Sequence, residues 1–167
     1  MGWYSILWSP WRAEYIKRVS RNSNKDCFIC EAVKNPNSPE NLTLLLKGNV
    51  IILLNKYPYN SGHLMVAPIR HVKNIEDLTQ DEWTEISKAI VLSKKLLDVA
   101  YKPDGYNIGA NLGKAAGAGL EDHLHFHIVP RWIGDASFMT VIGATKVIPQ
   151  SLEDTLKELK EILKNLI

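Results

Sequence analysis

The stretch His123-Leu124-His125-Phe126-His127-Ile128-Val129-Pro130 alternates histidine with apolar residues. In an extended strand, successive side chains point to opposite faces, so the three imidazoles share one face and the apolar side chains take the other. Residues two apart lie roughly 6.6 Å apart along a strand, which places all three imidazoles within reach of one extended ligand. Pro130 lacks an N–H group and is expected to close the strand. Burial alone gives no reason to repeat a costly polar group, which leaves two interpretations, a row of metal ligands or a catalytic row.

The composition limits the class of protein. The 167 residues are 46% hydrophobic, which suffices for one sizeable core, and a single domain over residues 1–167 is expected. The net charge of +2 is too small for a nucleic-acid scaffold, and no apolar run approaches the roughly 20 residues of a membrane span. The N-terminus lacks the basic and apolar regions of a signal peptide, and two cysteines are too few for a secreted disulfide framework. We therefore expect a cytoplasmic protein.

Residues 1–26 concentrate aromatic surface at the start of the chain. Three tryptophans fall within the first eleven residues, and Ser9 followed by Pro10 is a typical helix start. So much aromatic surface must be covered. We expect a tryptophan-rich arm that either docks on the body of the domain or contacts a second subunit of a homodimer.

Cys27 and Cys30 form a C-x-x-C motif, which in a cytoplasmic chain is either half of a zinc site or a redox pair. A thioredoxin-like redox pair would need a buried strand before it and a long helix after it. Here a polar segment precedes the motif, and the turn-rich stretch Asn35-Pro36-Asn37-Ser38-Pro39 follows it. The sequence therefore favours zinc over a redox pair, and two unligated thiols remain a further alternative.

Apolar runs broken by turn residues predict an α+β fold, with an antiparallel sheet of about five strands and one long helix packed on it. Lys47-Gly48-Asn49 separates the first two runs as a hairpin turn, and Thr79 with Glu82 forms a capping box at the start of the long helix. The expected strands cover 42–46, 50–54, 63–68, 105–111 and the histidine row; the long helix covers 79–101 with an apolar stripe of Trp83, Ile86, Ile90, Leu97 and Ala100; a C-terminal helix covers 151–166.

The five histidines fall in two places, the row itself and the ends of the 63–68 run at His63 and His71. If those two strands are neighbours, all the imidazoles converge on one site. The loop 113–119 is made of small residues and one lysine, so its backbone N–H groups can approach a phosphate closely. The sequence has no P-loop and no acidic pair for Mg²⁺, which argues against a kinase. This combination predicts nucleophilic attack on phosphorus by a neutral imidazole, with a phosphoramidate intermediate.

The run His-Leu-His-Phe-His-Ile-Val resembles the signature of the histidine triad (HIT) family, and the stretch from Ser61 to Pro68 resembles the family's other strand, which carries a fourth histidine. The resemblance spans residues 27–132. The Ser-Pro-Trp-Arg start, the Asn-Leu-Gly-Lys-Ala-Ala-Gly loop and the Pro-Arg-Trp end look most like the diadenosine-polyphosphate phosphorylase branch. The resemblance implies a HIT-like fold and a nucleotidyl transferase or hydrolase that cleaves dinucleoside polyphosphates through a covalent nucleotidyl-histidine.

The resemblance also implies roles for the histidines. His125, the middle of the triad, would be the nucleophile that takes the nucleoside α-phosphate. His127 would contact phosphate oxygens and help the leaving group, and His63 would support the triad from the neighbouring strand. His123 completes the catalytic row.

Substrate contacts are implied at four positions. Asn55 stands eight residues before His63, where the family places a polar residue on the ribose, and Asn111 opens the loop expected to bind phosphate. Family members often have Gly-Gln-Ser/Thr-Val before the triad, whereas Gly119-Leu120-Glu121-Asp122 stands here. Backbone contacts from Gly117 and Gly119 are therefore expected in place of side-chain contacts.

The missing half of a zinc site must come from histidine or carboxylate. His71 follows the third strand and His123 opens the triad strand, so both could reach the cysteine pair if those strands are neighbours. Galactose-1-phosphate uridylyltransferases, distant relatives of the HIT family, look similar here, with a C-x-x-C, a later histidine and the histidine two before the nucleophile. This resemblance implies Cys27, Cys30, His71 and His123 as the ligands of a structural Zn²⁺.

Two hypotheses of different classes follow. The first is the enzyme described above, with a nucleotide or dinucleotide as substrate. The second is a nucleotide-binding regulatory or scaffold protein with weak phosphoramidase-type turnover, since a fold does not guarantee a reaction. The presence of His125 favours the enzyme, because binding alone has no need of a nucleophile.

Overall fold

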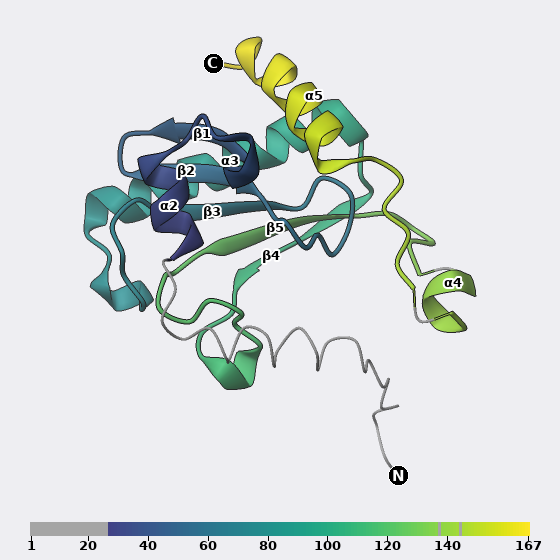
Figure 1. The fold of residues 1–167 in the computed structure, drawn as a ribbon, viewed down its shortest axis with the longest axis horizontal. Helices are drawn as coiled ribbons and strands as arrows, with labels where there is room; N and C mark the ends of the chain where they lie inside the picture. Colours follow the sequence, from purple (N-terminus) through teal and green to yellow (C-terminus); the bar gives the residue numbers. More distant parts are fainter. Residues whose placement is uncertain (1–26, 137, 144) are drawn as a thin grey trace.

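The computed structural model describes residues 27–136, 138–143 and 145–167. The expected arm over 1–26 lies outside the described residues, and the expected single domain over 1–167 stays a prediction. The described chain forms a five-stranded sheet in the order β1-β2-β3-β5-β4, with every neighbouring pair antiparallel (Figure 1). The strands are β1 (Thr43–Lys47), β2 (Val50–Leu54), β3 (Leu64–Pro68), β4 (Gly105–Ala110) and β5 (Phe126–Arg131). The predicted antiparallel α+β architecture is confirmed.

The pairing of β3 with β5 positions the candidate site. Met65 lies opposite His127 in this pair, and Val66 lies opposite Phe126. The two strands that carry or flank the histidines are therefore neighbours, which was the condition for the imidazoles to converge.

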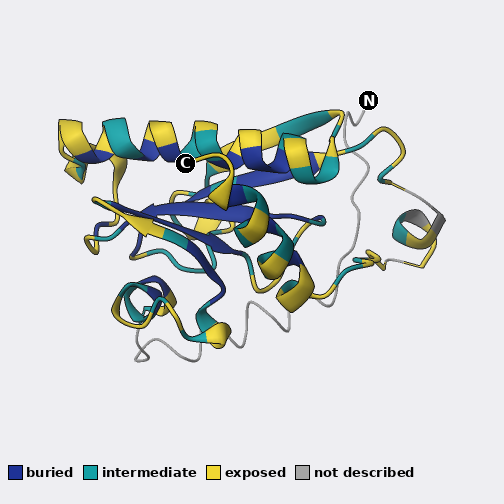
Figure 2. Cartoon of the chain, turned by 90° about the horizontal axis from the view of Figure 1, so that it is seen from above, coloured by how far each residue is buried: buried dark blue, intermediate teal, exposed yellow. Residues whose placement is uncertain are grey.

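Helix α3 (Gln80–Tyr101) begins at the predicted capping box. The Thr79 side chain accepts the Glu82 N–H at 3.2 Å, and the Glu82 carboxylate accepts the Thr79 N–H at 2.8 Å. The helix turns its buried side to the sheet and its exposed side to solvent (Figure 2). Helix α5 (Leu152–Lys164), which Ser151 caps, corresponds to the predicted C-terminal helix and packs on the same face of the sheet. This main core contains Ile86, Leu96 and Leu97 of α3, Leu159 and Leu163 of α5, and Leu124, Phe126 and Ile128 of the histidine row.

One residue of the predicted apolar stripe of α3 does not enter the core. Trp83 is 41% exposed, and its ring lies against Phe126 with 5.7 Å between the ring centroids. Trp83 occupies the first turn of the helix, so its bulky ring covers the rim of the core instead of entering it. Ile90 and Ala100 are partly buried, and Ala89, Ser93 and Leu96 complete the buried side.

The opposite face of the sheet is covered by α2 (Phe28–Lys34), a helix that the sequence analysis did not predict. Cys27 is its N-cap residue, and Cys30 lies in its first turn. Ile29 and Ala32 bury completely against a second core made of Ile51, Leu53, Met65 and Ala67. The helix is held by this packing, because seven residues are too few for stability on their own.

Strand β5 differs from the predicted strand at both ends. It begins at Phe126, because the Leu124 N–H donates to the Val72 carbonyl at 2.7 Å, outside the ladder with β3. Pro130 does not close the strand: it lies opposite Tyr106, and pairing continues to Arg131, whose carbonyl accepts the Asp104 N–H at 2.9 Å. A proline removes one donor from the ladder but keeps its carbonyl group, so the strand extends past it.

The remaining elements are short. They are helix α4 (Phe138–Val141) and the 3-10 turns η1 (Pro39–Asn41), η2 (Ile75–Asp77) and η3 (Lys114–Ala116). Within the described ranges, no helix is both long and apolar enough to cross a bilayer.

Candidate functional site

The structure gathers the histidines on the face of the sheet that α2 covers. His63 immediately precedes β3, His127 lies in β5, and His123 and His125 lead into β5. The side chains of His63, His123 and His125 are buried, with relative exposures of 1%, 0% and 7%. The imidazoles form two groups. His63 and His127 lie with His125, and His71 and His123 lie with the two cysteines.

The tautomer of His125 follows from its hydrogen bond. Its Nδ1 lies 2.9 Å from the main-chain carbonyl oxygen of His123, and a carbonyl can only accept, so Nδ1 carries the proton. The lone pair of the neutral ring is therefore on Nε2. Burial lowers the pKa of His125 below its ordinary value, against an opposing effect of the same hydrogen bond. A neutral imidazole with a free Nε2 lone pair is the form of histidine that attacks phosphorus.

The tautomers of His63 and His127 follow in the same way. The Tyr59 main-chain N–H donates to Nδ1 of His63 at 3.1 Å, so this nitrogen carries a lone pair and Nε2 carries the proton. Nε2 of His63 lies 3.0 Å from Nδ1 of His127 and donates to it. Nδ1 of His127 thus accepts, and its Nε2–H remains as a donor with no partner among the described residues.

Both members of this pair are held neutral. Burial, reinforced by neighbouring imidazoles, lowers the pKa of His63 to about 3 and that of His127 to about 4. Hydrogen bonding agrees with this direction, because the basic nitrogen of each ring already accepts an N–H group. At neutral pH the pair therefore presents a hydrogen-bond donor to the site without a positive charge.

Asn55, the predicted ribose contact, is engaged with its own loop. Its Oδ1 accepts the Tyr57 N–H at 2.9 Å, and its Nδ2 lies 3.4 Å from Nδ1 of His63. The amide keeps a second lone pair and a second N–H for a ligand. The structure places Asn55 beside the imidazoles, and the ribose contact stays a prediction.

The glycine-rich loop leaves the sheet next to His125. Ala110 lies opposite Phe126 in the β4–β5 pair, so Asn111 emerges beside His125. Gly113 and Gly117 have φ values of +77° and +83°, which glycine adopts without strain. Within the described residues, no hydrogen bond joins Gly117 or Gly119 to the triad, and their phosphate contacts stay predictions.

Two residues next to the imidazoles were missed in the sequence analysis. The ring of Tyr59 lies against His63 and His127, with 4.7 Å and 5.7 Å between ring centroids. Gly109 lies opposite His127 in β4, and a Cβ atom added there meets no described atom within 4 Å. The available signal for Tyr59 was its position four residues before His63, whereas the register that places Gly109 has no local signal.

Cys27, Cys30, His71 and His123 come together at the other end of the histidine row. One ligand atom from each lies within 4.8 Å of all the others. Nδ1 of His123 is 3.1 Å from Sγ of Cys27 and 3.5 Å from Sγ of Cys30, and Nδ1 of His71 is 3.2 Å from Sγ of Cys30. Ligand atoms of a tetrahedral zinc site lie roughly 3.3–3.8 Å apart, so this cluster fits Zn²⁺.

The surroundings of the cluster also suit a metal. Nε2 of His123 donates to the Pro68 carbonyl at 2.8 Å, which directs the Nδ1 lone pair at the sulfurs. Burial raises the pKa of the Cys27 thiol to about 11, whereas a reactive redox cysteine needs a lowered pKa. A cation would compensate for the buried thiolates. The four residues form a structural zinc site, because their closed donor set leaves no position for substrate.

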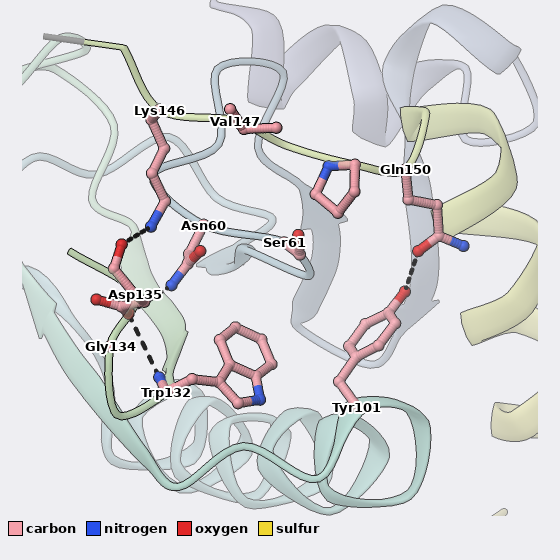
Figure 3. A pocket seen from close by; sticks show the side chains of 10 residues that line it. Asn60, Ser61, Tyr101, Trp132, Gly134, Asp135, Lys146, Val147 and Gln150 are labelled. Carbon is pink, nitrogen blue, oxygen red and sulfur yellow. Dashed lines mark hydrogen bonds between the residues drawn. The ribbon is translucent and has the colours of Figure 1, made fainter. Parts of the chain in front are cut away.

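A separate cavity of about 440 Å³ lies beside Asn60 and Ser61, at the end of the loop between β2 and β3 (Figure 3). Its lining includes Asn60, Ser61, Tyr101, Trp132, Lys146 and Gln150. The Asn60 amide donates to the Pro130 carbonyl at 3.0 Å and to Asp135 at 2.8 Å, which ties this loop to the end of β5. None of the five histidines lines this cavity, so it is distinct from the imidazole site.

Comparison with known proteins gives consistent matches. A family model described as HIT domain matches residues 36–132. The AP-4-A phosphorylase of Mycobacterium tuberculosis is 42% identical over 154 residues, which cover 89% of this chain and 79% of that protein.

Solved structures share the fold. A hypothetical histidine triad nucleotide-binding protein from Sulfolobus tokodaii aligns with a TM-score of 0.68 and 28% identity, over 84% of this chain and 93% of that chain. A zinc-bound histidine triad family protein from Mycobacterium smegmatis aligns with a TM-score of 0.68 and 24% identity, over 84% of this chain and 95% of that chain.

Proposed function

Because the chain belongs to the HIT family, we propose that it is an enzyme that cleaves dinucleoside polyphosphates by transferring a nucleoside monophosphate to His125. The AP-4-A phosphorylase that it resembles over most of both chains supports this substrate class. The observation that carries the proposal is the bond between His125 Nδ1 and the His123 carbonyl, which leaves the Nε2 lone pair available at neutral pH.

The first step is an in-line attack of Nε2 of His125 on the α-phosphorus. A nitrogen–phosphorus bond forms, and the bond to the bridging oxygen breaks with its electron pair on the leaving polyphosphate. The Nε2–H of His127 donates a hydrogen bond to an oxygen of the reacting phosphate or the leaving group. Such a donor stabilises negative charge that develops in the transition state.

The neutral state of His127 favours a polyphosphate leaving group. A terminal phosphate has a pKa of about 6, so a nucleoside polyphosphate departs as a stable anion without taking a proton. An amine leaving group, with a pKa of about 10, must be protonated as it departs. A neutral imidazole donates hydrogen bonds but is a weak acid. The site is therefore better suited to dinucleoside polyphosphates than to phosphoramidates.

In the second step an acceptor displaces His125 from phosphorus. Water yields a nucleoside monophosphate, and inorganic phosphate yields a nucleoside diphosphate. Lys114 lies in the glycine-rich loop with its side chain 84% exposed, and its ammonium is 3.8 Å from Glu121. This loosely paired positive charge favours an anionic acceptor, so we expect phosphate to compete with water.

Product analysis tests this function. Wild-type protein and His125→Ala are incubated with diadenosine tri-, tetra- and pentaphosphate and with an adenosine phosphoramidate, with and without inorganic phosphate. Dinucleotide cleavage that needs His125 and exceeds phosphoramidate cleavage supports the enzyme, and ADP formed from the tetraphosphate only when phosphate is present supports phosphorolysis. The triphosphate releases ADP as its leaving group in either case. Cleavage of the tetraphosphate to AMP and ATP in the presence of phosphate would make the protein a hydrolase. Tight nucleotide binding with only weak phosphoramidate turnover would instead identify a regulatory or scaffold protein.

We also propose a cytoplasmic homodimer. The two cysteines are free and suit a reducing compartment. Strand β4 is at an edge of the sheet, and Ile108 on this strand is 46% exposed. An exposed apolar edge strand is a common site of association between chains. Sedimentation of the full chain tests the dimer.

A further inference from the structure

We infer that Tyr59 is a positioning residue, which holds the His63–His127 pair in the hydrogen-bonding state that presents an N–H group of His127 to the substrate. The catalytic role of the pair rests on the proposed function. Its hydrogen bonds involve only the two imidazoles and the loop between β2 and β3.

The main chain of Tyr59 sets the direction of the hydrogen bonds. Its N–H donates to Nδ1 of His63 at 3.1 Å, which commits His63 to donate from Nε2 to His127. Were His63 to carry its proton on Nδ1, this N–H would face another N–H group. The direction of two successive hydrogen bonds therefore depends on where the Tyr59 backbone lies.

The side chain of Tyr59 keeps that backbone in place and covers the pair. Its ring is tilted by 45° to the His63 ring and by 32° to the His127 ring, at centroid distances typical of aromatic packing. The outer side of Tyr59 is open to solvent, since the residue is 49% exposed. The ring thus lies between the imidazole pair and water.

Loop contacts on either side of Tyr59 support this position. Tyr57 N–H is held by Asn55, and the His63 N–H donates to the Asn60 carbonyl at 3.2 Å. Asn60 is in turn tied to the end of β5. These contacts hold the loop on both sides of Tyr59, whose ring contacts both imidazoles.

Removing the ring would let water reach the pair. Burial is the largest cause that lowers the pKa of His63 and of His127, and His125 is the other titratable group that acts on both. Hydrated imidazoles take up a proton more readily. A protonated pair would have an N–H group where Nδ1 of His127 now accepts, which breaks the bond from His63.

The test measures the two imidazoles directly. Full-length protein labelled with ¹⁵N in histidine is titrated by NMR, which reports the tautomer and titration midpoint of each ring. In the wild type, His63 and His127 should both be Nε2–H tautomers at pH 7. In Tyr59→Ala the midpoint of His127 should rise by about one pH unit or more, towards the ordinary value of about 6.5.

One control variant separates the ring from general effects. Tyr59→Phe keeps the ring and should keep the wild-type midpoint. If Tyr59→Ala does not fold, Tyr59→Gln carries the same expectation. A midpoint and tautomer in the ring-deleted variants equal to the wild type would overturn the inference, as would a Tyr59→Phe variant that behaves like Tyr59→Ala.

Kinetics give an independent measurement. In Tyr59→Ala the acid limb of kcat should move upward by the same interval as the NMR midpoint, with little change in KM. A fall in kcat that is uniform across pH would indicate a merely structural role and contradict the inference. If the wild type cleaves no dinucleotide, the proposed function fails, while the NMR titration still decides the role of Tyr59.

Discussion

The main-chain carbonyl of His123 accepts the Nδ1–H of His125 at 2.9 Å, while the His123 ring faces the sulfurs of the cysteine pair at 3.1 and 3.5 Å. His123 therefore belongs to the zinc site through its side chain and holds the His125 ring through its backbone. A shift of His123 would move the acceptor that fixes the tautomer of His125. This arrangement connects the zinc site to the imidazole that we propose as the nucleophile.

Loss of zinc should therefore reduce both stability and activity. Metal analysis of protein purified without chelator should find about one zinc per chain. The double variant Cys27→Ser/Cys30→Ser should lose this zinc, lower the Tm and reduce kcat more than nucleotide affinity. A zinc-free wild type, or a double variant with unchanged Tm, would contradict the structural role. Either outcome would return His123 to the catalytic row alone.

Removal of the nucleophile should abolish turnover and preserve binding. His125→Ala should lose on the order of 10⁴-fold in kcat, since the imidazole forms the bond to phosphorus. Rapid acid-free quenching with labelled dinucleotide should trap a nucleotidyl adduct on the wild type and not on the variant. Measured turnover in His125→Ala comparable to the wild type would exclude the covalent mechanism.

Gly109 should be needed for space beside His127. A Cβ atom at position 109 meets no atom of the described residues within 4 Å, so the fold should tolerate Gly109→Leu. The new side chain would instead displace substrate beside His127. We expect kcat/KM to fall by roughly tenfold or more, because small displacements of a reacting group are costly. Gly105→Leu is the matched control: it lies on the same strand, equally open and opposite Arg131, and should keep wild-type activity. Equal activity of the two variants would show that the space is not used.

Stability should fall in mild acid because of the buried imidazoles. The pKa of His63 is lowered to about 3, so between this value and about 6.5 the unfolded chain binds a proton that the folded chain does not. This contribution is fully present above pH 6.5 and is lost as the pH falls through that window. For His63 the loss between pH 7.5 and 5 is about 2 kcal/mol.

The His63→Asn variant isolates that contribution. We expect the free energy of unfolding, measured in urea, to fall between pH 7.5 and pH 5 in both proteins. The fall should be smaller in the variant by about 2 kcal/mol, although the variant is less stable than the wild type at both pH values. The zinc ligands are the same in both proteins, so any loss of metal in acid affects both alike. Parallel pH dependence in the two proteins would show that His63 is not held neutral by the fold.

Local patterns in the chain were enough to predict most of the secondary structure. The capping box of Thr79 and Glu82 and the turn at Gly48 act within a few residues, so both are present in the structure as predicted. The period of two in the histidine row placed Leu124, Phe126 and Ile128 in the main core. Helix α2 escaped prediction because seven residues have little intrinsic helical preference, and tertiary packing of Ile29 and Ala32 holds them.

The residue types alone establish which groups the site contains: five imidazoles, two thiols and a loop of small residues. Their division into two groups follows from contacts between distant parts of the chain. The pairing of β3 with β5 joins His63 to His127, and the packing of α2 brings the cysteines to His71 and His123. Atoms far apart along the chain also set the histidine tautomers, the position of the Tyr59 ring over the imidazoles and the open space at Gly109. No local pattern encodes such contacts, because strand register and helix packing are set by the cores as a whole.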